Sequence, residues 1–150
     1  MRKRSAASSR SREPRRPITY FIDRSLGDRI VAKALRTHGL TVHVHKDHFP
    51  PDAKDEDWLR EVGQRHWVVL TKDKMLRYRQ TETTALLAAK VRAFVLTSGN
   101  LRADEMAAAL IKALPKLERF LRSYPTRWGR TGRFWCYALH SEQRPTAIRA

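Results

Sequence analysis

Short apolar runs recur along the chain, separated by stretches whose apolar residues follow a helical spacing. Five runs are rich in β-branched and aromatic residues and read as strands: Ile18–Asp23, Leu40–His45, Trp67–Thr71, Val91–Thr97 and Phe134–Leu139. The third run is almost continuously apolar, which is typical of a parallel strand that is buried on both faces. The pattern therefore predicts a sheet of about five strands.

Helices are expected between these strands. After the first strand, Leu26, Ile30, Ala34 and Leu35 fall on one helical face, and Gly39 supplies a stop. Ser25 is the expected cap of this helix.

A second helix is expected to begin at Asp55, in an acidic first turn that the helix dipole favours. A less regular helical stretch covers Thr83–Lys90. A long helix begins at Ala103, and Pro115 is expected to kink or split it. Its apolar stripe consists of Met106, Leu110, Leu114, Leu117 and Leu121.

Strands that alternate with helices predict right-handed βαβ units and a three-layer α/β/α domain with a mainly parallel central sheet. We place this domain at residues 18–140. Residues 1–17 are rich in Arg and Ser and predict a disordered basic arm, and residues 141–150 are expected to form a flexible tail.

The charge balance indicates the class of partner. The 150 residues include 31 Lys and Arg against 15 Asp and Glu, a formal net charge of +16 at pH 7. Such a chain attracts polyanions in a salt-dependent way, so nucleic acid is the first expected partner and an acidic protein the second. No apolar run approaches the roughly 20 residues of a membrane-spanning helix. The single Cys136 excludes a disulfide framework, so a cytoplasmic location is expected by elimination.

Three aspartates carry the candidate chemistry. Asp23 ends the first strand, Asp73 follows the third, and Asp55 opens the second helix. Ligands of α/β sheets bind at the carboxyl ends of the strands. Carboxylates gathered there repel one another by roughly 4 kcal/mol per pair at about 4 Å, which favours a bound Mg²⁺ or Mn²⁺. The set predicts metal-assisted hydrolysis of a phosphodiester.

Each aspartate also has a simpler interpretation. Asp55 is alternatively a helix cap, Asp73 a turn former, and Asp23 the partner of Arg24 in a salt bridge. Asn100, after the fourth strand, is either a further oxygen ligand or phosphate contact, or a helix cap.

Basic residues near these positions are candidate nucleic-acid contacts. Arg24 follows Asp23, and Lys72 and Lys74 flank Asp73. Three more arginines interleave with aromatic residues, as in RNA-binding surfaces, or else belong to a charged loop beside core aromatics: Arg127, Arg130 and Arg133.

Three histidines form an H-x-H-x-x-H pattern: His43, His45 and His48. Zinc binding is one interpretation. The chain offers no evident fourth ligand, and a polar strand face is the simpler account.

The segment from Ile18 to about Tyr124 resembles a PIN-like domain, in the branch related to VapC-type toxins with its compact FxD…sDeeil…vlTkD pattern. The matching stretches are YFIDRSLG, KDEDWL, VVLTKDKML and FVLTSGNLRADEM. The resemblance implies a small three-layer α/β fold and a ribonuclease that depends on Mg²⁺ or Mn²⁺. It also places Asp23, Asp55 and Asp73 at the acidic metal-site positions.

The resemblance further implies RNA as substrate and an antitoxin protein as partner, and it leaves open whether two copies form a homodimer. PIN nucleases commonly have a fourth acidic residue after the next strand, where this chain has Ser98 and Asn100. The main hypothesis is therefore an endoribonuclease toxin, and the first alternative is a non-catalytic PIN-like module that binds RNA or protein. A phosphoacceptor receiver domain is a second alternative, but it would need an acidic pair where Asp23 is followed by Arg24.

Overall fold

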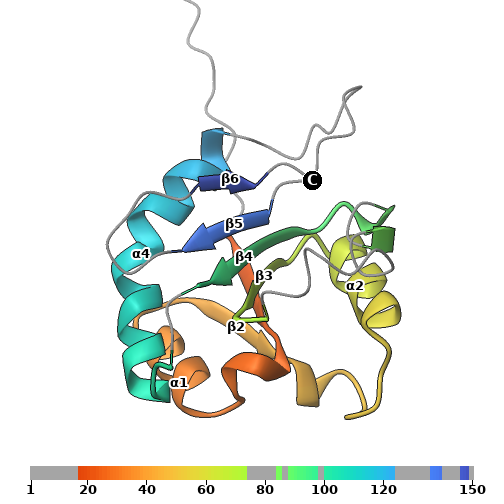
Figure 1. Ribbon diagram of the computed structural model, residues 1–150, viewed down its shortest axis with the longest axis horizontal. Helices are drawn as coiled ribbons and strands as arrows, with labels where there is room; N and C mark the ends of the chain where they lie inside the picture. Colours follow the sequence, from red (N-terminus) through yellow and green to blue (C-terminus); the bar gives the residue numbers. More distant parts are fainter. Residues whose placement is uncertain are drawn as a thin grey trace, which may run out of the picture.

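The computed structural model describes residues 17–73, 84–85, 88–97, 100–123, 136–139 and 146–148. The described strands form one sheet in the order β2-β1-β3-β4-β5-β6 (Figure 1). Their bounds are β1 (Thr19–Ile22), β2 (Thr41–Val44), β3 (Val68–Thr71), β4 (Arg92–Leu96), β5 (Cys136–Leu139) and β6 (Thr146–Ile148). The first five strands are parallel to their neighbours, and β6 is antiparallel to β5. The mainly parallel sheet is confirmed, whereas β6 lies in the last ten residues, where the sequence predicts no element.

Helices cover both faces of the sheet, which confirms the three-layer α/β/α fold. In Figure 1, α1 and α4 lie on one side of the sheet and α2 lies on the other. None of the described helices is long and apolar enough to cross a membrane. The bounds are η1 (Arg24–Leu26), α1 (Ile30–Thr37), η2 (His45–Asp47), α2 (Asp55–Gln64) and α4 (Ala103–Ser123), where η denotes a short 3-10 helix.

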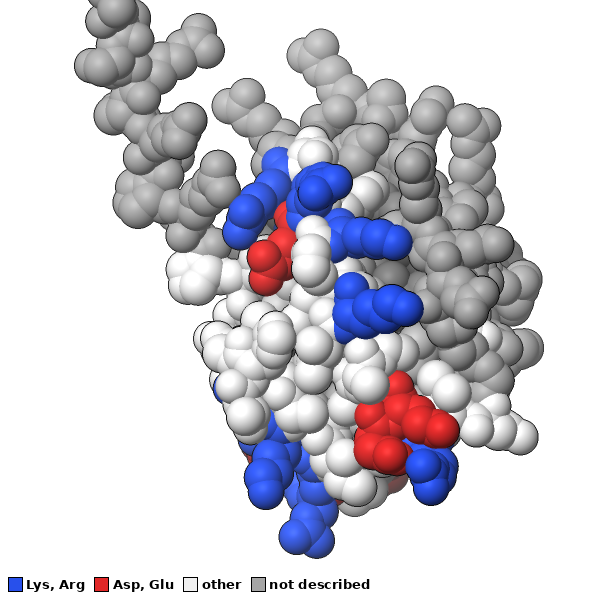
Figure 2. All heavy atoms as spheres, turned by 90° about the vertical axis from the view of Figure 1, so that its left-hand side faces the viewer, with Lys and Arg blue, Asp and Glu red and all other residues white. Residues whose placement is uncertain are grey.

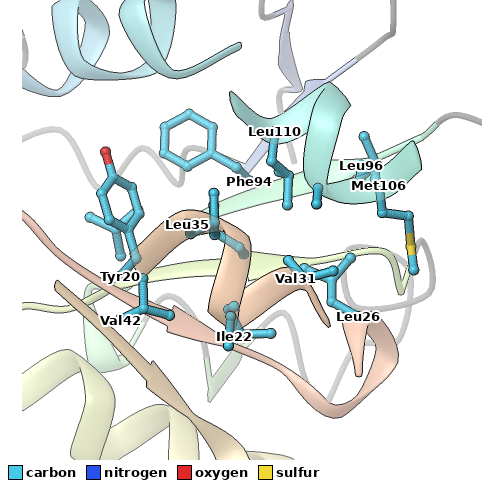
Figure 3. Close-up of a cluster of buried hydrophobic side chains, with 14 of the residues drawn as sticks. Tyr20, Ile22, Leu26, Val31, Leu35, Val42, Phe94, Leu96, Met106 and Leu110 are labelled. Atoms are coloured by element: carbon cyan, nitrogen blue, oxygen red, sulfur yellow. The ribbon is translucent and has the colours of Figure 1, made fainter. Parts of the chain in front are cut away.

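Alternating side chains of the strands divide the core into two clusters. Tyr20 and Ile22 of β1 pack with buried residues of α1 and α4, while Phe21 packs against Trp58 of α2. Figure 3 shows the first cluster, with Tyr20 at one end and Met106 at the other. A period of two therefore places alternate residues of β1 in opposite layers.

Two details of α1 differ from the prediction. The helix begins at Ile30. The buried residues of the helix are Val31, Ala32 and Leu35, so Ile30 lies on another face and is 56% exposed. Ser25 lies in η1 and does not cap the helix. The predicted stop is present, since Gly39 has φ +89°, a left-handed conformation that favours glycine.

The sequence predicts a kink or a split at Pro115, and the helix is not split there, because α4 continues through this residue. Pro115 is exposed, while Leu114 and Leu117 on either side of it are buried. Burial of this stripe offsets the lost backbone hydrogen bond, which costs about 3 kcal/mol in a helix interior. Of the helical stretch predicted at Thr83–Lys90, residues 84–85 and 88–89 are helical, and residues 83, 86 and 87 lie outside the described residues.

The hydroxyl of Tyr20 generates a first prediction. The side chain is fully buried, and its hydroxyl has no hydrogen-bond partner within the described residues. An unpaired buried hydroxyl costs about 1–3 kcal/mol. Tyr20→Phe should therefore raise the free energy of unfolding by about 1 kcal/mol in a denaturant titration. A decrease would show that the hydroxyl has a partner in the folded protein.

His43 generates a prediction about pH. Its ring stacks on Trp67 with 4.1 Å between centroids, and its Nδ1 lies 3.0 Å from Nε2 of His48. Burial, followed by repulsion from His48 and Arg36, lowers the pKa of His43. As the pH falls through about 6.5, the unfolded chain therefore takes up the proton first, and the free energy of unfolding decreases.

His43→Phe keeps the stacked ring and should make this decrease smaller, as measured by urea unfolding at about pH 7.5 and 5.5. His38→Gln, at an exposed position after α1, is the matched control and should leave the decrease unchanged. Equal pH dependence of wild type and His43→Phe would contradict the assignment.

Candidate active site

Asp23 lies at the carboxyl edge of the sheet, directly after β1. Ile22 pairs with Leu70 of the neighbouring parallel strand β3, and the backbone N–H of Asp23 donates to the carbonyl of Leu70 at 3.0 Å. The residue is only 8% exposed. A buried aspartate at this edge needs partners for its carboxylate, and the structure supplies them.

Three donors surround the Asp23 carboxylate. The backbone N–H of Arg24 donates to Oδ1 at 2.7 Å, while Ser25 N and Thr71 Oγ1 donate to Oδ2 at 3.4 and 2.9 Å. An ionised carboxylate offers about four lone-pair sites. These contacts leave it capacity for one further electropositive ligand.

The hydroxyl groups of Ser25 and Thr71 connect the ends of β1 and β3. Because Thr71 donates its only hydroxyl proton to Asp23, the 3.0 Å contact between Ser25 Oγ and Thr71 Oγ1 has Ser25 as the donor. Ser25 Oγ in turn accepts from the backbone N–H of Lys72 at 3.0 Å. The backbone N–H of Asp73 donates to Thr71 Oγ1 at 3.0 Å, so one hydroxyl positions both aspartates.

The contact between Ser25 and Thr71 was not predicted from the sequence. The available signal was a hydroxyl residue two positions from each aspartate, Ser25 after Asp23 and Thr71 before Asp73. Parallel pairing of β1 with β3 brings these hydroxyls together. The sequence of either strand alone does not reveal this pairing.

Asp55 is the first residue of α2, but it is not the cap of that helix. The cap position is occupied by Lys54, without a side-chain hydrogen bond. Oδ1 of Asp55 accepts from Nη2 of Arg24 at 3.0 Å and from Nε1 of Trp58 at 2.8 Å. The Arg24 guanidinium also donates to the carbonyl of Pro51. The Arg24 guanidinium is therefore the ion-pair partner of Asp55, whereas only the backbone N–H of Arg24 contacts Asp23.

The three aspartates share one edge without forming a closed ligand set. Thr71 joins Asp23 to Asp73, whereas Asp55 is turned toward Arg24. Among the residues that the structure describes, no three His, Cys, Asp or Glu are close enough together to hold a metal ion. Their oxygen chemistry suits a hard divalent cation. The ion pair with Arg24 holds Asp55 in its observed position.

The remaining candidates are less well placed or lie outside the described residues. Lys72 is exposed beside Asp73. Asn100 is exposed and does not cap α4, because the helix begins at Ala103 and the backbone N–H of Arg102 bonds to Glu105 Oε2 at 2.8 Å. Four basic residues fall outside the described residues, and their roles stay predictions: Lys74, Arg127, Arg130 and Arg133.

His45 lies at the same edge and was not predicted there. Ile22 pairs with Val44, so His45 follows β2 at the level where Asp23 follows β1. The side chain is 2% exposed, and its Nε2 has no hydrogen-bond partner in the part of the chain that the structure describes. Burial lowers the pKa of His45, and so does the Arg24 charge, while Asp23 and Asp55 act in the opposite direction. The site thus has an imidazole among its charged groups.

The histidine pattern does not form a zinc site in the described part of the chain. His43 and His48 bond to each other, while His45 packs against Phe49 and Trp58. No group of three ligand residues includes them.

Comparison with known proteins agrees with this architecture. A family model described as "PIN like domain" matches residues 18–98, which include all three aspartates. Over 106 residues, 68% of this chain and 77% of the relative, the sequence is 26% identical to "Putative ribonuclease VapC45" of Mycobacterium tuberculosis (strain ATCC 25618 / H37Rv). No solved structure matches. The family model covers more than half of the chain and confirms the resemblance. The chain belongs to the PIN-like domain family.

Proposed function

We propose that this protein is a metal-dependent endoribonuclease and the toxin of a toxin–antitoxin pair. The observation that carries the proposal is the Asp23 carboxylate, which is buried at the carboxyl edge of the sheet and linked through Thr71 to Asp73. The family and the ribonuclease name of the relative support the same reaction class. A cytoplasmic location goes with this role.

In this proposal Asp23 and Asp73 hold Mg²⁺ or Mn²⁺, and Asp55 joins them when Arg24 releases it. The bound ion would lower the pKa of a water and stabilise charge on the phosphate. Arg24 and Asp55 form an ion pair at 3.0 Å whose side chains are 43% and 24% exposed, so RNA phosphates can compete for the guanidinium. Substrate binding would then free Asp55 and give Arg24 a phosphate to bind.

The surface charge supports RNA as the substrate. Figure 2 shows basic side chains gathered on the face that carries α1 and α4. Exposed basic residues of α4 on this side of the sheet are Lys112, Lys116, Arg119 and Arg122. Such residues bind phosphates without regard to sequence, so RNA binding should weaken as salt rises. An acidic antitoxin would suit the same charge.

A second candidate function is a PIN-like module that binds RNA or protein without cleaving it. The Arg24–Asp55 ion pair favours it, because this pair holds one carboxylate away from the other two. The sequence also has Ser98 and Asn100 where PIN nucleases commonly carry a further acid.

Asp23→Asn tests the nuclease proposal. The wild-type protein should cleave structured RNA in the presence of Mg²⁺ or Mn²⁺ and stop when EDTA is added. The variant should lose on the order of 100-fold or more of this activity, because an amide removes the charge that faces the ion. RNA binding, measured by fluorescence anisotropy, should remain. Like Asp23→Asn, Lys33→Gln changes the net charge of the protein by one unit, but at an exposed position of α1, so it is the control for the change in charge.

Two outcomes would overturn the nuclease proposal. Salt-sensitive RNA binding without cleavage in any divalent metal would favour the binding module. Undiminished cleavage by Asp23→Asn would place the chemistry elsewhere. The toxin role is tested separately by expression in cells, where growth arrest should be relieved by Asp73→Asn.

Thr71→Val tests the hydroxyl that positions the aspartates. The change keeps the shape of the side chain but leaves Asp23 Oδ2, Ser25 Oγ and the Asp73 N–H without their partner. The free energy of unfolding should fall by about 1–3 kcal/mol, and RNA cleavage should decrease. Thr71→Ser keeps the hydroxyl and should retain most of both. Equal loss in the two variants would mean that the methyl group matters, not the hydrogen bonds.

A further inference from the structure

A cavity of about 840 Å³ opens at the edge of the sheet opposite to the aspartates. It is lined by the beginnings of β1, β2 and β4, by the turn before β3, and by the end of α4. In parallel strands the amino ends share one edge and the carboxyl ends share the other. Asp23, Asp55 and Asp73 do not line the cavity, so it is separate from the candidate active site.

Tyr20 is one of the residues that line this cavity. Its side chain is 0% exposed, and its hydroxyl has no hydrogen-bond partner among the described residues. Burial raises the pKa of this phenol above its usual range, and the Glu118 carboxylate adds to the effect. The phenol therefore stays protonated and adds no negative charge to the cavity lining.

Three guanidinium groups line the same cavity, those of Arg65, Arg92 and Arg122. Arg92 is half-buried, and its Nη2 donates to the carbonyl of His66 at 3.3 Å. Burial lowers the pKa of Arg92, although the group keeps its charge at neutral pH. A half-buried cation has lost part of its hydration, and an anion bound in the cavity would compensate for that loss.

The other two arginines keep donors available. Arg65 pairs with Glu61 and lies over the Trp67 ring, 4.9 Å from its centroid. Arg122 lies 3.5 Å from Glu118, the one carboxylate among the lining residues. A guanidinium has five N–H donors, and these contacts use only part of them. Among the described residues, the charged side chains that line the cavity are therefore three arginines and one glutamate.

We propose that this cavity binds a phosphomonoester of mononucleotide size, either a free nucleotide or the phosphorylated end of an RNA strand. The planar fork of arginine matches phosphate oxygens in pairs. Small-molecule sites commonly measure about 300–1,000 Å³, and inorganic phosphate would leave most of this cavity empty. The Glu118 carboxylate accepts from hydroxyl or amino groups, which a nucleoside provides. Leu40 and Leu121, which line the cavity, supply apolar surface for the base of the nucleoside.

The test is equilibrium titration of the full-length chain by calorimetry. The ligands are inorganic phosphate, adenosine and guanosine monophosphates, and a short RNA with either a 5′-phosphate or a 5′-hydroxyl. At least one phosphomonoester should bind saturably, and more tightly than inorganic phosphate or the hydroxyl-ended RNA. Preference for the mononucleotides identifies a free ligand, and preference for the phosphorylated RNA identifies a strand end.

Matched variants locate the binding. Arg92→Gln should weaken it by about tenfold or more, since a charge-assisted hydrogen bond is lost. Tyr20→Phe removes a hydroxyl that is not accessible from the cavity, so this variant should bind like wild type. Lys33→Gln removes a positive charge outside the cavity, and Asp23→Asn changes the other edge; both should bind like wild type.

Three results would overturn the inference. One is the absence of saturable binding by any phosphomonoester. Another is equal weakening by Lys33→Gln and Arg92→Gln, which would indicate general attraction to a basic protein. The third is loss of binding in Asp23→Asn, which would place the ligand at the aspartates. The readout is binding, so failure of the nuclease proposal leaves it unaffected.

Discussion

The hydrogen bond from the Thr71 hydroxyl to the Asp23 carboxylate is the interaction on which the candidate site depends. It crosses from β3 to β1 at 2.9 Å, in a place where Thr71 is 1% exposed. A hydroxyl there has no water to exchange with, so its geometry is fixed by the strands. The same oxygen receives the Asp73 N–H, which ties the third aspartate to the first. The site is thus a property of the pairing between two strands.

The sequence predicted the fold well where burial alone decides the structure. Apolar runs identified β1 to β5, and the leucine stripe identified α4. The prediction from sequence was wrong where tertiary contacts outweigh the local preference of a residue for helix or strand. Pro115 ends a helix by propensity, yet buried leucines on both sides carry α4 through it. The strand β6 has only three residues and pairs with β5. No local sequence pattern predicts this pairing.

The candidate site shows the same division. Aspartates at strand ends could be predicted because a parallel sheet gathers such ends on one edge. The partners of those aspartates could not, since Arg24 reaches across 31 positions to Asp55, and Ser25 reaches across 46 to Thr71. His45 was interpreted with its sequence neighbours His43 and His48, while its place beside Asp23 follows from strand register. Contacts between distant residues of this kind need the fold before they can be seen.

The shortness of β1 has an electrostatic consequence. Tyr20 in β1 and Asp23 directly after it stand three positions apart, about 10 Å along the strand axis. This separation is close to the Debye length of about 8 Å at physiological ionic strength, and the intervening protein screens charge less than water does. A cation at one edge and an anion at the other would therefore attract each other through the sheet. By thermodynamic reciprocity, each would bind more tightly when the other is present.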